Sequence, residues 1–237
     1  MPDSLIIITP VKDSLDTTRE TIDHIFQAEG EFKYYIFNDF SSDSTESWLT
    51  KNQEEKNFTL VNLGDHVDTP SPNYKTTLQM SRKMALDNEA HLMIVESDVL
   101  VSKDTISQLL SLASSLDNAG MIGSVTVDTE GKINFPYNHV SENDPDLYVT
   151  DRSLSFCCTL LTNSFLNSFD FAELNTEKDW YDVFISKKSR KLGYNNYLAK
   201  NLPVIHKPHS SRPWKMEKYS NPFKYYFKKF FLKRDRI

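Results

Sequence analysis

The stretch that decides the fold is His91-Leu92-Met93-Ile94-Val95-Glu96-Ser97-Asp98-Val99. Its apolar part has the length of a β-strand, and it stops at two carboxylates that lie one residue apart. In an open α/β sheet, ligands bind outside the carboxyl ends of the strands. We therefore expect Glu96 and Asp98 to hold a metal ion or a polar substrate.

Two earlier strand-like segments also end in polar clusters. Residues 5–9 are apolar and rich in β-branched side chains, and the strand is predicted to end at Pro10, which has no N–H to donate. Apolar residues at helical spacing predict a helix over 16–28, and a second strand over 34–37 leads into the polar residues 38–45. The order strand, helix, strand predicts a right-handed parallel α/β unit.

The second half of the chain is less regular. Residues 141–152 are acidic and polar, contain Pro145 and are predicted to form a surface loop. A strand is predicted over 155–162, a helix over 176–192 that ends at Gly193, and a final short strand within 197–206.

Composition and charge limit the function classes. The formal net charge of −6 is unevenly distributed, because residues 215–237 carry eight Lys and Arg against Glu217 and Asp235. An acidic body argues against general nucleic-acid binding. The N-terminal apolar run is too short for a signal peptide or a membrane span, and the two cysteines are adjacent rather than spaced as a disulfide framework. These features predict a cytoplasmic protein.

Together, the three strand ends resemble the motifs of the family 2 glycosyltransferases of GT-A fold. The motifs stand here as Pro10-Val11-Lys12-Asp13, Asn38-Asp39-Phe40-Ser41-Ser42-Asp43-Ser44-Thr45 and Glu96-Ser97-Asp98, in the order and spacing of the family. Asn38 and Glu96 replace the first acids of their motifs, and Phe40 and Ser44 replace glycines. The resemblance covers most of the first two hundred residues, more strongly in the first half.

The resemblance implies a nucleotide site and a metal site. By this resemblance, Pro10 and Asp13 would line the pocket for the base, Asp39 would accept from a nucleobase that is usually uracil, and Arg82 would face the phosphates. The full set of implied nucleotide-binding residues is Thr9, Pro10, Asp13, Asp39, Arg82, Ser97 and Asp98. The implied cation is Mn²⁺ or Mg²⁺, with Asp98, Glu96 and His206 as ligands; His206 is chosen over His209 because it directly follows an apolar run. Hard cations of this kind take carboxylate and phosphate oxygens.

The resemblance also implies a general base, an acid near the start of a helix and before a Gly-Tyr pair. Asp179 and Asp182 both fit, ahead of Gly193 and Tyr194, and Asp179 is preferred. Acids in a first helical turn also simply complement the positive end of the helix, so a structural role stays open. Cys157 and Cys158 are interpreted as core packing, since no base or other metal-ligating cluster lies near them in sequence.

The C-terminal segment 215–237 is predicted to be a basic, aromatic helix. Its rings fall on one helical face and its cations surround them, which suits either a membrane interface with anionic headgroups or another protein surface. The enzyme is thus expected in the cytoplasm, and the first of these alternatives would bring it to the inner face of the membrane.

These observations predict a GT-A domain over 1–214, with a mixed, mostly parallel sheet between helices, a nucleotide-binding half over 1–101 and an acceptor half over 102–214. The expected function is inverting transfer of a sugar from a nucleoside-diphosphate sugar, UDP-linked by resemblance, to a hydroxyl of a glycan or lipid-linked acceptor. Two alternatives stay open: a degenerate protein that binds nucleotide or glycan without turnover, and a sugar-nucleotide nucleotidyltransferase. A nucleotidyltransferase would need a glycine-rich loop after the first strand, and residues 10–13 contain no glycine.

Overall fold

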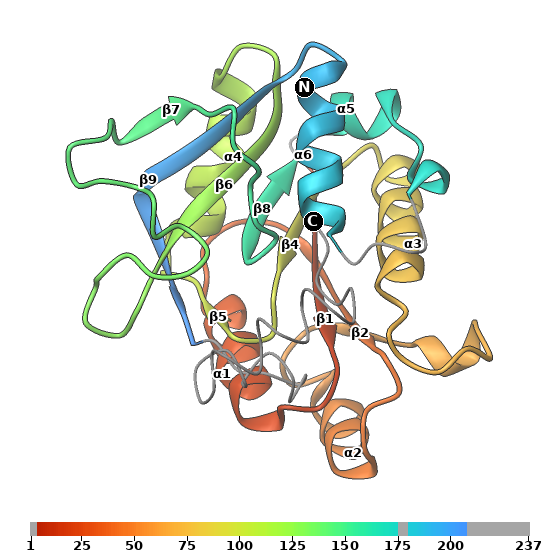
Figure 1. The fold of residues 1–237 in the computed structure, drawn as a ribbon. Coiled ribbons are helices and arrows are strands. Elements are labelled where there is room, and N and C mark those ends of the chain that lie inside the picture. Colours follow the sequence, from red (N-terminus) through yellow and green to blue (C-terminus); the bar gives the residue numbers. More distant parts are fainter. Residues whose placement is uncertain (1–3, 175–179, 208–237) are drawn as a thin grey trace, which may run out of the picture. The chain divides into compact units, whose positions relative to one another are not determined.

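The computed structural model describes residues 4–174 and 180–207. Helices and strands alternate along most of this chain (Figure 1). Their bounds are β1 Leu5–Val11, α1 Leu15–Phe26, β2 Lys33–Asn38, α2 Asp43–Asn52, β3 Thr59–Asn62, η1 Leu63–Asp65, α3 Tyr74–Asp87, β4 His91–Val95, β5 Val99–Leu100, α4 Thr105–Ser115, β6 Ala119–Val127, β7 Leu147–Val149, β8 Cys158–Leu161, α5 Asn163–Ser168, η2 Phe171–Glu173, α6 Tyr181–Lys191 and β9 Asn195–His206.

The strands form one mixed sheet in the order β3-β2-β1-β4-β8-β6-β9-β5, and β7 pairs with β9. The first four strands of this order are parallel to one another. From β8 onward the pairing is mixed, since β8 is antiparallel to β4 and β6 while β6 and β9 are parallel. The predicted fold class, a sheet flanked by helices, is confirmed.

Helices cover both faces of the sheet, and the alternation of strand side chains explains why. In β1, Leu5 and Ile7 pack into the core cluster that contains α1 and α4, whereas Ile6 and Ile8 pack into the cluster that contains α3, α5 and α6. Successive side chains of a strand point to opposite faces. A continuously apolar strand therefore requires cover on both sides, as parallel α/β sheets have.

β1 continues through Pro10 to Val11, beyond the predicted end of the strand. The pairing of β1 with β4 stops at Ile8 and Ile94, whereas its pairing with β2 runs on to Val11. Pro10 therefore has a strand neighbour on one side only, which is a position where a sheet tolerates proline.

The prediction of a short last strand was wrong, because β9 is twelve residues long. It pairs with β6 on both sides of an irregularity, from Ser124 with Ala199 to Thr126 with Val204. The extra residues at this bulge include Lys200 and Asn201, whose polarity interrupts the apolar pattern in the sequence. The bulge lets the strand continue to His206.

Candidate active site

The polar strand ends meet at one edge of the sheet. β2, β1 and β4 are adjacent and parallel, so their carboxyl ends lie side by side (Figure 1). These ends lead into the segments that carry Asp39, Asp13 and Asp98, respectively. Three motifs that are far apart in sequence are thus neighbours in space, at the place where open α/β sheets bind ligands.

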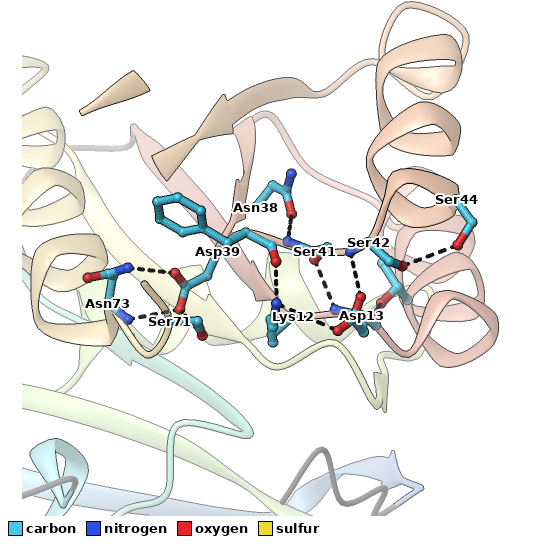
Figure 2. A network of polar contacts seen from close by, with 11 residues as sticks. Lys12, Asp13, Asn38, Asp39, Ser41, Ser42, Ser44, Ser71 and Asn73 are labelled. Carbon is cyan, nitrogen blue, oxygen red and sulfur yellow. Dashed lines mark hydrogen bonds and ion pairs between the residues drawn. The ribbon is translucent and has the colours of Figure 1, made fainter. Parts of the chain in front are cut away.

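The turns after β1 and β2 are joined by a network of hydrogen bonds (Figure 2). The backbone N–H of Ser42 donates to Asp13 Oδ1 over 2.7 Å, and the N–H of Asp13 donates to Ser41 Oγ over 2.9 Å. The Lys12 ammonium donates to the carbonyl oxygen of Phe40. The Ser42 N–H, which bonds the charged carboxylate, lowers the pKa of Asp13 below its ordinary value. The two motif turns therefore form one connected surface.

Phe40 occupies the place of a motif glycine and adopts the left-handed backbone conformation, with φ of 55°. Glycine reaches this region without steric cost, whereas a residue with a Cβ does not. The ring of Phe40 lies against Gly64, at 3.4 Å from the position that a Cβ would take there. The turn thus keeps the shape that a glycine allows even though the residue is aromatic.

Asp39 holds a neighbouring loop. Its Oδ2 accepts from Ser71 Oγ and from the backbone N–H of Asn73, each over 2.8 Å, and its Oδ1 accepts from Asn73 Nδ2 over 2.9 Å (Figure 2). A carboxylate offers about four acceptor positions. One position is left after these three bonds, so Asp39 can orient the loop and still accept one donor from a nucleobase.

Two predicted nucleotide-binding residues are engaged elsewhere. The Thr9 side chain is fully buried, and its Oγ1 accepts from the Tyr34 hydroxyl over 2.9 Å. The Arg82 guanidinium donates to the Leu166 carbonyl over 3.0 Å and contacts Asp170 at 3.2 Å.

The position of Arg82 on its helix explains these contacts. α3 begins beside Asp39 and returns toward the start of β4, so Arg82 lies about 12 Å along the helix from Tyr74. The structure therefore does not gather Thr9 or Arg82 with the other groups, and their contacts with nucleotide stay predictions.

Asp98 and His206 meet across β5 and β9. These strands pair antiparallel with Val99 opposite His206, which brings Asp98 Oδ2 to 3.5 Å from His206 Nε2. Both side chains are largely buried. His206 Nδ1 lies 2.7 Å from the Phe135 carbonyl oxygen, an atom that can only accept, so Nδ1 carries a proton. Burial lowers the pKa of His206, but the Asp98 carboxylate outweighs it and the net pKa is raised.

Glu96 lies beside Cys157, a contact that the sequence did not indicate. β4 and β8 pair antiparallel with Val95 opposite Cys158, so the residues next to that pair, Glu96 and Cys157, are also neighbours. Cys157 Sγ lies 3.5 Å from Glu96 Oε2. Cys157 is buried, as expected of core packing, but its thiol faces a candidate site residue. Burial and then the Asp98 charge raise the pKa of Glu96 to about 7.

Asp182 lies in the first turn of α6, and its charge reaches the same cluster. It contributes to the raised pKa of Glu96 and to that of Tyr74, whose main cause is burial. Its Oδ1 accepts from the backbone N–H of Val183 over 2.8 Å, a bond that also fits a first-turn structural role. Asp179 lies outside the described residues, as does the predicted C-terminal helix.

The residues at this edge fit a divalent cation chemically. Burial first, and then the charge of the neighbouring Asp98 carboxylate, raise the pKa of Glu96. The Phe135 carbonyl keeps a proton on His206 Nδ1, so Nε2, at 3.5 Å from Asp98 Oδ2, is the nitrogen that can bind a cation once it has lost its own proton. A cation between these groups would relieve the repulsion and take the carboxylate ligands, which suit Mn²⁺ and Mg²⁺, together with the imidazole nitrogen.

A family model described as Glycosyl transferase family 2 matches residues 6–169. The chain belongs to this family. The match extends from β1 to the residue after α5, so it includes the three strand-end motifs but ends before Asp182 and His206. No curated protein matches the sequence.

Solved structures show the same GT-A fold at low identity. A mannosyltransferase from Pyrobaculum calidifontis in complex with GDP-Man and Mn²⁺ has a TM-score of 0.66 and 16% identity, over 98% of this chain and 65% of that one. S. aureus TarS 1-349 in complex with UDP-GlcNAc has a TM-score of 0.67 and 14% identity, over 88% and 60%. GalNAc-T7 with UDP, GalNAc and Mn²⁺ has a TM-score of 0.64 and 9% identity, over 88% and 44%. This family 2 chain spans less than two thirds of each of these structures.

In residues 4–174 and 180–207, helices that combine the length and the apolar character needed to cross a bilayer are absent.

Proposed function

We propose that this family 2 chain transfers a sugar from a nucleoside-diphosphate sugar to a hydroxyl of a glycan or lipid-linked acceptor. The observation that carries the proposal is the convergence of Glu96 and Asp98, from the β4–β5 turn, with His206, from the end of β9, at the edge that also presents the β1 and β2 motifs. The fold alone does not require acids after three adjacent strands, as Asp13, Asp39 and Asp98 are, at one ligand-binding edge. Two solved structures that share the fold hold nucleotide sugars, GDP-Man and UDP-GlcNAc.

In this proposal the site is divided along the sheet edge. Asp13 and Asp39, with Pro10, form the nucleoside end, where the one remaining acceptor position of Asp39 receives a base N–H. Asp98, with Glu96 and His206, forms the diphosphate end and would hold Mn²⁺ or Mg²⁺. When bound there, such a cation supplies charge stabilisation to the diphosphate leaving group. Hydrogen bonds with Asn73, Ser42 and Phe135 keep the side chains of Asp39, Asp13 and His206, respectively, oriented when no nucleotide sugar is bound.

The acceptor end carries the general base, Asp179 or Asp182. The base removes the proton of the acceptor hydroxyl as its oxygen attacks the sugar. For Asp182 the supporting observation is its electrostatic reach to Glu96. We also propose inversion at the anomeric carbon, on the family resemblance, and keep a peripheral membrane contact through residues 215–237 as a prediction from the sequence.

The test is donor consumption by the full chain with Mn²⁺ and a panel of UDP- and GDP-sugars, with and without cell-extracted acceptors. We expect hydrolysis or transfer from one donor, reduced at least a hundredfold by Asp98→Asn. The matched control is Glu31→Gln, because Glu31 is exposed and precedes β2, at the opposite end of the strand. Equal activity in Asp98→Asn and the control would contradict the proposal. Comparing Asp179→Asn with Asp182→Asn then identifies the general base.

A second candidate is binding without turnover, and one observation favours it. The motif acid is replaced by Asn38, whose side chain is buried and used within the protein, donating to Asn62 Oδ1 over 2.9 Å and accepting from the Ser41 N–H over 3.1 Å. Thermal stabilisation by a nucleotide, together with no donor consumption under any condition of the panel, would support this candidate. Comparison of UDP with GDP in the same measurement identifies the preferred nucleobase.

A further inference from the structure

Three different metal-ligating groups meet at the edge of the candidate site. Glu96, Cys157 and His206 each offer one ligand atom, and these atoms all lie within 4.8 Å of one another. They are the residue after β4, the residue before β8 and the last residue of β9, so only the folded chain brings them together. The set combines carboxylate, thiol and imidazole.

The spacing suits a small tetrahedral ion. Zn²⁺ binds sulfur at about 2.3 Å and nitrogen or oxygen at about 2.1 Å, so tetrahedral ligands of these kinds lie about 3.6 Å apart. The Glu96 Oε2 to Cys157 Sγ distance is 3.5 Å. All three ligand atoms lie within 4.8 Å of one another, so the imidazole needs a shift of no more than about 1.2 Å to complete three ligands at tetrahedral spacing.

We propose that Glu96, Cys157 and His206 form a binding site for a borderline or soft divalent cation such as Zn²⁺. This site shares Glu96 and His206 with the position proposed for Mn²⁺ or Mg²⁺, so the two kinds of cation exclude each other. Thiolate is the ligand that distinguishes them, because it selects softer metals while carboxylate and carbonyl oxygens suit Mg²⁺ and Mn²⁺. The inference concerns cation binding alone and does not depend on sugar transfer.

Neighbouring groups orient two of the three ligands. Ser155 Oγ donates to Cys157 Sγ over 3.2 Å, and the Phe135 carbonyl accepts from His206 Nδ1, which leaves Nε2 as the ligand atom. Such outer partners fix the direction of ligand atoms and raise metal affinity. Two of the three ligands are therefore held in place without a metal.

A buried hydroxyl also lies at this cluster without a protein partner. Tyr74 Oη is buried and makes no hydrogen bond within the described part of the chain. Its ring packs against Phe156, the residue before Cys157, with ring centroids 6.4 Å apart, and burial together with the charges of Glu96, Asp182 and Cys157 raises the pKa of the hydroxyl. A water molecule bound as the fourth ligand would give Tyr74 Oη a partner.

Binding displaces the thiol proton of Cys157. Burial raises the pKa of this thiol, so it is protonated without a metal, and the ion exchanges with the proton as the thiolate bond forms. The thiol proton leaves to solvent, together with the protons that Glu96 and His206 Nε2 carry when they are protonated, and the charges of Glu96 and the thiolate neutralise the ion. No oxidation or reduction takes place.

The experiment is a titration of the reduced full chain with Co²⁺, followed by absorption spectroscopy. We expect one equivalent of Co²⁺ to give a near-ultraviolet thiolate-to-metal charge-transfer band and the visible bands of tetrahedral Co²⁺, and Zn²⁺ to abolish both. The chain has two cysteines, so the band must arise from Cys157 or Cys158. A wild-type spectrum without the charge-transfer band would overturn the proposal.

Variants assign the ligand. Cys157→Ser should lose the band and bind Zn²⁺ at least about a hundredfold more weakly, and Ser155→Ala should weaken Zn²⁺ about tenfold. Cys158→Ser is the matched control, since Cys158 is the adjacent buried thiol and its neighbour is Ser124, outside the cluster; it should keep the band. If Cys157→Ser does not fold, Glu96→Gln and His206→Gln replace it and must each weaken Zn²⁺. A band that survives Cys157→Ser, or unchanged Zn²⁺ affinity in both replacement variants, would refute the site.

Discussion

Replacement of Asp39 by alanine should destabilise the protein before any ligand is added. The carboxylate accepts three hydrogen bonds from the loop before α3, two from Asn73 and one from Ser71. Alanine removes both acceptor oxygens and so all three hydrogen bonds at once. The loop then loses this anchor on the end of β2, and the start of α3, at Tyr74, is affected next.

The magnitude depends on which donors can find water. Asn73 is buried, so loss of the acceptor for its backbone N–H costs about 1–3 kcal/mol. Its side-chain amide keeps the Thr69 carbonyl at 2.8 Å, and the half-buried Ser71 hydroxyl can turn to solvent, so each adds about 0.5–1 kcal/mol. We expect Asp39→Ala to lower the free energy of unfolding by about 3 kcal/mol, or the melting temperature by about 9 °C.

The assay is urea unfolding of the nucleotide-free protein, with Asp43→Ala as the control. Asp43 is an exposed carboxylate on the first turn of α2, four residues along the same motif, and its loss should cost about 0.3–1 kcal/mol. A loss in Asp39→Ala no larger than that in Asp43→Ala would refute the anchoring argument. Reduced nucleotide affinity with unchanged stability would instead assign Asp39 to the ligand alone.

Three further predictions concern stability and placement. Gly120→Ala should destabilise the protein by about 2–3 kcal/mol in thermal unfolding, because a Cβ there would lie 2.3 Å from Ser189 Oγ and 2.6 Å from Tyr194 Cβ. The control is Gly64→Ala, where the new Cβ would meet only the Phe40 ring at 3.4 Å, and its effect should stay within about 1 kcal/mol. Equal effects of the two substitutions would contradict this prediction. Arg82→Ala should lower the free energy of unfolding by about 1–2 kcal/mol, because it removes the contacts of Arg82 with Leu166 and Asp170. Nucleotide affinity should stay within about twofold. A large loss of nucleotide affinity at unchanged stability would instead support the phosphate contact predicted from the sequence. Asp13→Asn should lower the free energy of unfolding at pH 7, measured in urea. The difference from the wild type should shrink as the pH falls below the ordinary pKa of 3.8, because a carboxylate whose pKa is lowered in the folded state stabilises the protein only while it is ionised. A difference that grows in acid would contradict this sign.

Much of the fold could be predicted from local sequence. The apolar runs of β1, β2 and β4 are continuous, and a strand that is apolar on both faces requires helices on both sides of its sheet. The polar residues that follow each run mark the strand ends, and parallel pairing of such strands brings their ends to one edge. Asp13, Asp39 and Asp98 could therefore be assigned to one site from the sequence, together with the family.

The rest depended on pairings that have no local signal. Antiparallel pairing of β4 with β8 sets Cys157 beside Glu96, although 61 residues separate them, and a bulge carries β9 through a polar interruption to place His206 beside Asp98. The direction of α3 takes Arg82 away from the sheet edge on which Asp39 lies. The sequence by itself determined which strands end in polar residues that can bind a ligand. Only the tertiary structure showed that Cys157 joins this site and that Arg82 lies away from it, because register and helix direction are set by the packing of the whole core.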